Sequence, residues 1–119
     1  MGHLLDGLNH VAIRVRDIEA CARFYRDVLH LYLRSFDGQM AFFECGGTEF
    51  VLIGDPGQRD SSGQLAHIGF RVENPEKLDY FAHRVAEAGC PNIDGPKSTP
   101  GGRTLYFTDP EGIVVEIYC

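Results

Sequence analysis

The sequence predicts an α+β fold in which two βαβββ modules form a cupped mixed sheet with helices on its convex faces. Two observations support this prediction. A short strand-like segment at residues 10–15 recurs at residues 67–72, and each copy is followed by one helical stretch and three short strand-like stretches. A repeated order of elements indicates a duplicated structural unit.

The first strand of each module has the pattern H-x-x-x-R-V. Apolar residues alternate along both copies with the period of two that is typical of a half-buried strand. The other face of each strand carries a histidine, a small residue and an arginine. These are His10, Ala12 and Arg14 in the first copy, and His67, Gly69 and Arg71 in the second.

A helix is predicted after each of these strands. Asp17 can cap the first, in which apolar residues recur at helical spacing from Ile18 to Leu29. Asn74 can cap the second, Pro75 suits its first turn, and Gly89 ends it.

Three further strands are expected in each module from short apolar runs separated by turn residues. In the first module they are placed near residues 31–36, 40–45 and 49–53, with turns at 37–38 and 46–47. In the second module they are placed near residues 91–93, 104–108 and 113–118, with a hairpin turn at 109–112.

The chain of 119 residues is expected to form a single domain, residues 1–119, with module one at 7–54, a linker at 55–63 and module two at 64–119. The net charge of −6 and the lack of a basic run argue against nucleic acid or an anionic membrane as a partner. Four cysteines without a C-x-x-C pair suggest free thiols in a reducing cytoplasm. A homodimer is expected, because each chain alone would expose a sheet edge.

Three residues are candidates for a divalent metal site. His10 and His67 begin equivalent strands, and Glu116 stands between Val115 and Ile117 in the last strand. Imidazoles and a carboxylate that converge from separate elements suit such an ion. A glutamate in an apolar strand also needs a partner. Each histidine taken alone is equally compatible with an ordinary strand position.

Three stretches resemble the vicinal oxygen chelate superfamily, which includes glyoxalases, bleomycin and fosfomycin resistance proteins and extradiol dioxygenases. They are L-N-H-V at 8–11, F-Y-R-D-V-L at 24–29, and L-Y-F-T-D-P-E-G at 105–112 before Glu116. The resemblance implies one divalent ion (Ni, Zn, Mn, Co or Fe) on His10, His67 and Glu116. It also implies a small substrate chelated through two adjacent oxygens.

Glyoxalase I resembles this pattern but uses a fourth ligand in the last strand of the first module. Ungapped alignment of the two halves places Leu52 opposite Glu116, whereas a one-residue difference in the hairpins would select Val51. Both are apolar. If the hairpins differ by one residue, Glu49 shares the face of Val51 and is a candidate for a catalytic base or for a residue that hydrogen-bonds a metal ligand. The alternative is an exposed carboxylate at the start of a strand.

Fosfomycin resistance proteins and extradiol dioxygenases use a His-His-Glu set, but neither pattern is complete here. Ala12 replaces a threonine of the former, and residues 50–65 lack a histidine that the latter use. Tyr106 remains as a catalytic candidate in either case. Arg14, Arg71, Lys97 and Arg103 are the candidates for binding an anionic substrate.

Three functions follow. The first is a metal-dependent enzyme of the glyoxalase and fosfomycin-resistance type, acting as a lyase, isomerase or transferase. The second is an iron-dependent extradiol-type dioxygenase. The third is a metal-free protein that sequesters a drug, for which the retained His-His-Glu set is unfavourable.

Overall fold

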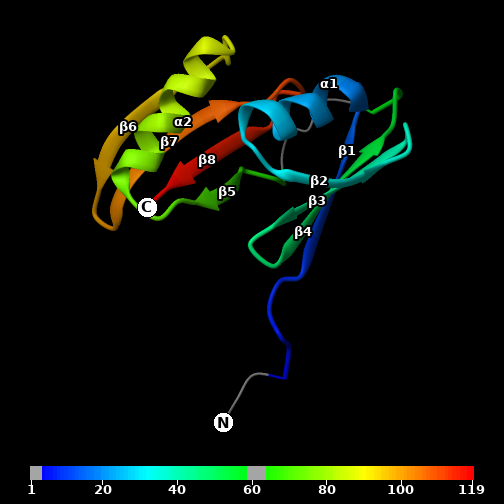
Figure 1. The fold of residues 1–119 in the computed structure, drawn as a ribbon, viewed down its shortest axis with the longest axis horizontal. Coiled ribbons are helices and arrows are strands. Elements are labelled where there is room, and N and C mark those ends of the chain that lie inside the picture. The colour runs from blue at the N-terminus through cyan, green and yellow to red at the C-terminus, as the bar shows by residue number, and fades with distance from the viewer. Residues whose placement is uncertain (1–3, 59–63) are drawn as a thin grey trace. The chain divides into compact units, whose positions relative to one another are not determined.

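Both repeats fold as βαβββ modules in the computed structural model, which describes residues 4–58 and 64–119 (Figure 1). The chain divides into two units, residues 1–58 and 59–119, and each is described by itself. Residues 55–58 of the predicted linker belong to unit 1, and residues 59–63 lie outside the described residues. The α+β class and the two modules predicted from the sequence are confirmed.

Unit 1 contains two helical segments and four strands. Its elements are β1 (His10–Val15), α1 (Ile18–Arg23), the π-helical η1 (Phe24–Val28), β2 (Tyr32–Phe36), β3 (Met40–Cys45) and β4 (Thr48–Gly54). Unit 2 repeats the order with a single helix. Its elements are β5 (Ile68–Arg71), α2 (Pro75–Glu87), β6 (Asp94–Thr99), β7 (Gly102–Thr108) and β8 (Val114–Tyr118).

The two sheets have the same topology. Their strand orders are β1-β4-β3-β2 and β5-β8-β7-β6, so the first strand of each module lies beside the last. That pair is parallel, and the other pairs in each sheet are antiparallel. Each module therefore closes its sheet by returning its last strand to the middle, next to the histidine-bearing strand.

Both predicted helix caps are present. The Asp17 carboxylate accepts a hydrogen bond from the Ala20 N–H at 3.1 Å, and the Asn74 side chain accepts one from the Lys77 N–H at 2.9 Å. A helix N-terminus leaves such N–H groups without a backbone partner, so each cap satisfies a donor that is otherwise unpaired.

The core of each unit lies between its helix and one face of its sheet. In unit 1 the buried Tyr25 ring packs on Phe43 and Phe50, with ring centroids 6.3 and 4.8 Å away. In unit 2, α2 lies along β6 and β7 (Figure 1) and buries Leu78 and Val85. Because side chains alternate along a strand, His10 and Glu49 in unit 1 and Glu116 in unit 2 lie on the opposite sheet face.

The third-last strand of unit 2 departs from the prediction. Residues 91–92 form a turn, and the strand is β6, which begins at Asp94. The sequence of β6, D-G-P-K-S-T, is poor in residues that favour strands, and it contains a proline. An edge strand tolerates this proline because it pairs on one side only.

The ungapped alignment of the two halves is wrong by one residue in the last strand. Ala12 pairs with Val51, and the repeat-equivalent Gly69 pairs with Glu116. Val51, and not Leu52, therefore occupies the position of Glu116. Between equivalent paired positions, the chain from Tyr106 to Glu116 is one residue longer than the chain from Phe42 to Val51, and this difference shifts the register.

Two absences hold for the residues that the structure describes. None of the four cysteines forms a disulfide bond, and Cys21 is buried while the other three are partly buried. Within residues 4–58 and 64–119 there is no helix with the length and apolar character needed to cross a membrane.

Candidate functional site

The open face of the unit 2 sheet brings together four of the predicted site residues. The His67 Nε2 and Glu116 Oε1 atoms lie 3.2 Å apart. Tyr106 pairs directly with Glu116 across β7 and β8, and its ring meets the His67 ring edge-on at 5.6 Å. The Lys97 Nζ atom lies 5.9 Å from the centre of the Tyr106 ring.

Strand register explains why these side chains meet. His67 stands immediately before β5, and Gly69 two residues later pairs with Glu116 on β8. Gly69 carries no side chain, and a Cβ placed there would lie 3.6 Å from Glu116 Oε1. The glycine therefore leaves space beside the carboxylate on the side where His67 approaches.

The donor set of His67 and Glu116 fits a divalent ion. Two ligand atoms at about 2.1 Å from one ion, separated by roughly 90–110°, lie about 3.0–3.4 Å apart. The observed separation of 3.2 Å falls in this range. Both side chains are partly exposed, with 40% of His67 and 18% of Glu116 accessible, so an ion can reach them.

Within neither unit do the described residues bring three or more His, Cys, Asp or Glu side chains together as a metal-binding group. His10, the third predicted ligand, belongs to unit 1, where it lies on the exposed face of β1. Its Nδ1 atom is 3.4 Å from the Asn9 side-chain oxygen. If Nδ1 carries the proton toward Asn9, the Nε2 atom keeps its lone pair for a ligand.

Glu49 stands beside His10 in unit 1. The two residues are register partners in the parallel pair β1 and β4, so their side chains share a face. The Glu49 carboxylate accepts a hydrogen bond of 2.6 Å from the Arg34 guanidinium. Arg34 occupies the irregularity in β2 between Leu33 and Ser35, which directs its side chain toward Glu49.

Lys97 is held by a similar irregularity in unit 2. The pairing of β6 with β7 shifts between Asp94 and Lys97, and the Lys97 ammonium donates to the Asp94 carboxylate at 2.7 Å. This hydrogen bond raises the pKa of Lys97, and the negative charge of Asp94 adds to the effect. Asp94 thus holds the Lys97 ammonium, which like an ordinary lysine is cationic at neutral pH, next to Tyr106.

The remaining predicted residues are distributed over both units and both faces. Arg14 shares the face of His10 and lies 3.9 Å from the Asp55 carboxylate. Arg71 shares the face of Gly69 and Glu116. Side chains alternate along β7, so Arg103 lies on the helix-covered face, opposite to the face that carries Thr104 and Tyr106. The geometry therefore separates Arg103 from the group around Glu116.

Thr104 is the residue at this site that the sequence reasoning missed. Its hydroxyl donates to Glu116 Oε2 at 2.6 Å, and the residue is buried. The alternation of β7 could have identified it, because Thr104 stands two residues before Tyr106 and so on the same face.

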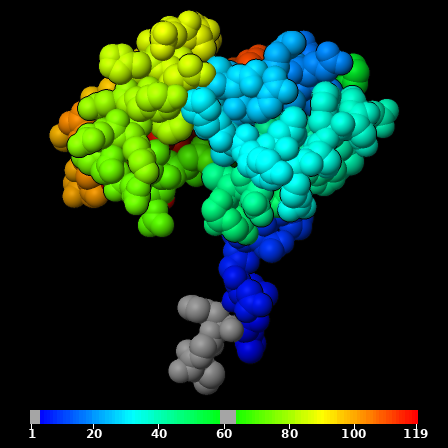
Figure 2. Space-filling model, viewed as in Figure 1, coloured from blue at the N-terminus to red at the C-terminus, as the bar shows by residue number. Residues whose placement is uncertain are grey.

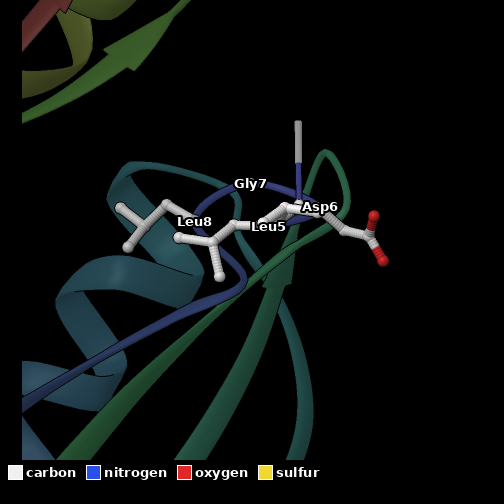
Figure 3. Close-up of a pocket in the computed structure, with 5 residues that line it drawn as sticks. Leu5, Asp6, Gly7 and Leu8 are labelled. Carbon is white, nitrogen blue, oxygen red and sulfur yellow. The ribbon is translucent and has the colours of Figure 1, made fainter. Parts of the chain in front are cut away.

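A hollow elsewhere on the molecule does not coincide with these residues. It is lined by residues 4–8, which precede β1 (Figure 3). These residues project from the body of unit 1 in Figure 2, and Leu4, Leu5 and Leu8 are between 78% and 100% exposed. A single extended stretch with no polar group besides Asp6 offers no catalytic chemistry, so we place the functional site elsewhere.

Residues 7–117 match the family described as the Glyoxalase/Bleomycin resistance protein/Dioxygenase superfamily. The chain therefore belongs to this superfamily, and the resemblance to vicinal oxygen chelate proteins found in the sequence is confirmed.

Relatives of known name cover nearly the whole chain. A metallothiol transferase FosB from Shouchella clausii is 29% identical, and the match covers 97% of this chain and 81% of the relative. A fosfomycin resistance protein FosX from Mesorhizobium japonicum is 26% identical, with 97% and 86% covered. A solved structure of a glyoxalase/dioxygenase from Nostoc punctiforme has a TM-score of 0.86 at 26% identity, with 98% of this chain and 92% of that chain covered.

Proposed function

We propose that this protein is a divalent-metal-dependent enzyme of the glyoxalase and fosfomycin-resistance type. The observation that carries the proposal is the approach of His67 Nε2 to Glu116 Oε1, at 3.2 Å, on the open face of unit 2. The named transferase and resistance relatives support an enzyme of this superfamily. Its substrate would be a small molecule that offers two adjacent oxygens, and its reaction a lyase, isomerase or transferase reaction.

His10, His67 and Glu116 would hold the ion, which is one of Ni, Zn, Mn, Co or Fe. Two neutral imidazoles and a carboxylate are a common ligand set, and three protein ligands leave positions free for substrate oxygens. A divalent ion bound there would supply Lewis-acid stabilisation of negative charge on those oxygens. His10 would come from the same chain or from the partner subunit of a homodimer.

The other residues of this face would bind and orient the substrate. Lys97, which its hydrogen bond to Asp94 holds beside Tyr106, would attract an anionic group, and Tyr106 would donate a hydrogen bond. Arg71 in unit 2 and Arg14 in unit 1 lie on the faces that carry the histidines and could extend the positive charge. Arg103, on the opposite face, has no geometric support for this role.

Glu49 would act near His10 without binding the ion. Its carboxylate is bonded to Arg34, and it lies two residues before Val51, the position equivalent to Glu116. Two strand residues span about 6.5 Å, which is too far for the ligand position itself. We therefore place Glu49 as a base or as a charge beside His10.

An extradiol-type dioxygenase is a second candidate. It is favoured by the position of Tyr106, which pairs with Glu116 and whose ring contacts the His67 ring edge-on. Elemental analysis of protein purified without added metal separates the candidates. Nickel, zinc, manganese or cobalt at about one ion per chain supports the first, and iron supports the dioxygenase. Protein that contains no metal and binds none in titration would instead be a sequestering protein, and the proposal would fail.

We also propose a cytoplasmic homodimer that binds no nucleic acid and no membrane. Size-exclusion chromatography with light scattering tests the assembly, and the expected mass is twice that of one 13.2 kDa chain. A strictly monomeric species would contradict the dimer.

A further inference from the structure

Thr104 stands out among the buried polar residues of the described chain. Three such residues are Thr104, Thr108 and Asp109. A buried polar group almost always has a hydrogen-bond partner. The Thr108 hydroxyl donates to the Pro91 carbonyl at 3.2 Å, and the Asp109 carboxylate accepts from backbone N–H groups of its own turn. Thr104 alone of the three bonds a residue of the proposed metal site.

The hydrogen bond from Thr104 to Glu116 is short. The distance of 2.6 Å lies in the range typical of a hydroxyl that donates to an ionised carboxylate. Such a carboxylate only accepts, so the hydroxyl must donate. Thr104 is 3% exposed, and water competes little for this bond.

The two carboxylate oxygens of Glu116 have separate partners. Oε2 accepts from Thr104, and Oε1 lies 3.2 Å from His67 Nε2 on the side left open by Gly69. We propose that Thr104 is a positioning residue that fixes the rotation of the Glu116 carboxylate and so presents Oε1 to the metal ion. This inference rests on the proposed metal-dependent function.

The first module lacks both members of this pair. Strand pairing makes Met40 the equivalent of Thr104 and Val51 the equivalent of Glu116, because Met40 pairs with Ile53 and Thr104 with Tyr118. The hydroxyl is therefore present in the module that supplies the carboxylate and absent from the one that does not. A threonine that served only the packing of the strand would have no reason to follow the carboxylate.

The test compares variants by titration of metal-free protein with Co²⁺, followed by calorimetry and by the visible absorption of the bound ion. Thr104→Val and Thr104→Ala remove the hydroxyl, and Thr104→Ser keeps it. Thr108→Val is the matched control, since it removes a buried hydroxyl from the same strand and the same face without touching Glu116. Thermal unfolding of each metal-free variant identifies those that fold.

The folded variants without the Thr104 hydroxyl should bind Co²⁺ roughly 10–100-fold more weakly, the loss typical when a group that orients a ligand is removed. Thr104→Ser and Thr108→Val should stay within about 3-fold of the natural protein, well short of that loss. If Thr104→Ala and Thr108→Val bind Co²⁺ equally well, the inference is wrong while the proposed function stands. If the natural protein binds no Co²⁺, the proposed function fails, and the inference fails with it.

Discussion

The two units share one topology, and one row of side chains across the open face of the sheet shows most clearly how they differ. In unit 1 this row contains Ala12, Val51 and Phe42, and in unit 2 the equivalent positions hold Gly69, Glu116 and Tyr106. The backbone pairing is the same in both rows. Different side chains at equivalent positions therefore make this row apolar in unit 1 and largely polar in unit 2.

The polar groups of unit 1 lie elsewhere on its sheet. His10 and Glu49 are register partners, and each lies two residues before a member of the apolar row, Ala12 or Val51, on the same face. The Arg34 guanidinium neutralises the charge of Glu49. In unit 2 the position equivalent to Glu49 is Val114. Each unit thus has a carboxylate on its open face, but only that of unit 2 lies beside a histidine at ligand distance. Four experiments test this difference between the units.

The largest effect is expected from Glu116→Gln, which removes the charge that distinguishes unit 2. Metal affinity, measured by calorimetric titration with Co²⁺, should fall by on the order of 100-fold or more, at or beyond the upper end of the roughly 10–100-fold typical for a residue behind a ligand. Tyr118→Phe, two residues along β8 on the same face, is the control and should bind nearly as well as the natural protein. Full affinity in Glu116→Gln would remove the basis for the contrast.

The next largest effect is expected on the stability of the hairpin between β7 and β8. The turn between β3 and β4 is formed by Gly46 and Gly47, both with positive φ, whereas the loop between β7 and β8 depends on Asp109. The buried Asp109 carboxylate accepts from the N–H groups of Glu111 and Ile113 at 2.8 and 2.9 Å. Asp109→Ala should lower the free energy of unfolding by about 2–3 kcal/mol, because one buried and one partly buried N–H donor lose their partner.

Urea unfolding at equilibrium measures this loss. Asp109→Asn retains the accepting oxygen and is expected to lose only about 1 kcal/mol. A loss below this value in Asp109→Ala would mean that the longer hairpin holds its register without the carboxylate.

A smaller effect is expected on the alkylation rates of two thiols, one in each unit. Burial raises the pKa of both Cys45 in unit 1 and Cys90 in unit 2, and for Cys90 the charge of Asp109 raises it further. Both thiols should therefore react slowly with iodoacetamide at pH 7, because the thiolate is the reactive form. Asp109→Asn should speed the alkylation of Cys90 a few-fold and leave Cys45 unchanged, since each pKa unit changes the thiolate fraction about tenfold.

Mass spectrometry of the labelled peptides gives both rates in one experiment. Equal acceleration of the two thiols would indicate general loosening of the variant and would contradict an electrostatic origin.

The smallest effect is expected from Glu49→Ala. Metal affinity should stay within about 3-fold, below the roughly 10–100-fold typical of a residue that supports a ligand. The free energy of unfolding should change by less than about 1 kcal/mol, because both side chains of the ion pair between Glu49 and Arg34 are partly exposed to water. Arg34→Ala is the matched control for the ion pair. A loss of metal affinity above tenfold in Glu49→Ala, but not in Arg34→Ala, would show that the Glu49 carboxylate supports or binds the ion and would contradict this prediction.

The sequence alone predicted the features that depend on local patterns. The two strands with H-x-x-x-R-V, the caps at Asp17 and Asn74 and the helix of unit 2 all agree with the structure. Alternation along a strand also assigned His10 and Glu116 to the faces away from the helices. Each of these depends on neighbours within a few residues, which the sequence displays directly.

The tertiary structure decided what depends on the pairing of distant strands. A difference of one residue between two hairpins moved the equivalent of Glu116 from Leu52 to Val51, and such a shift places side chains on the other face of the sheet. β6 formed despite an unfavourable sequence because β7 offers it a hydrogen-bonding edge. Thr104 reaches Glu116 for the same reason: the residues are twelve apart in the chain, and only the register of β7 against β8 brings the hydroxyl to the carboxylate.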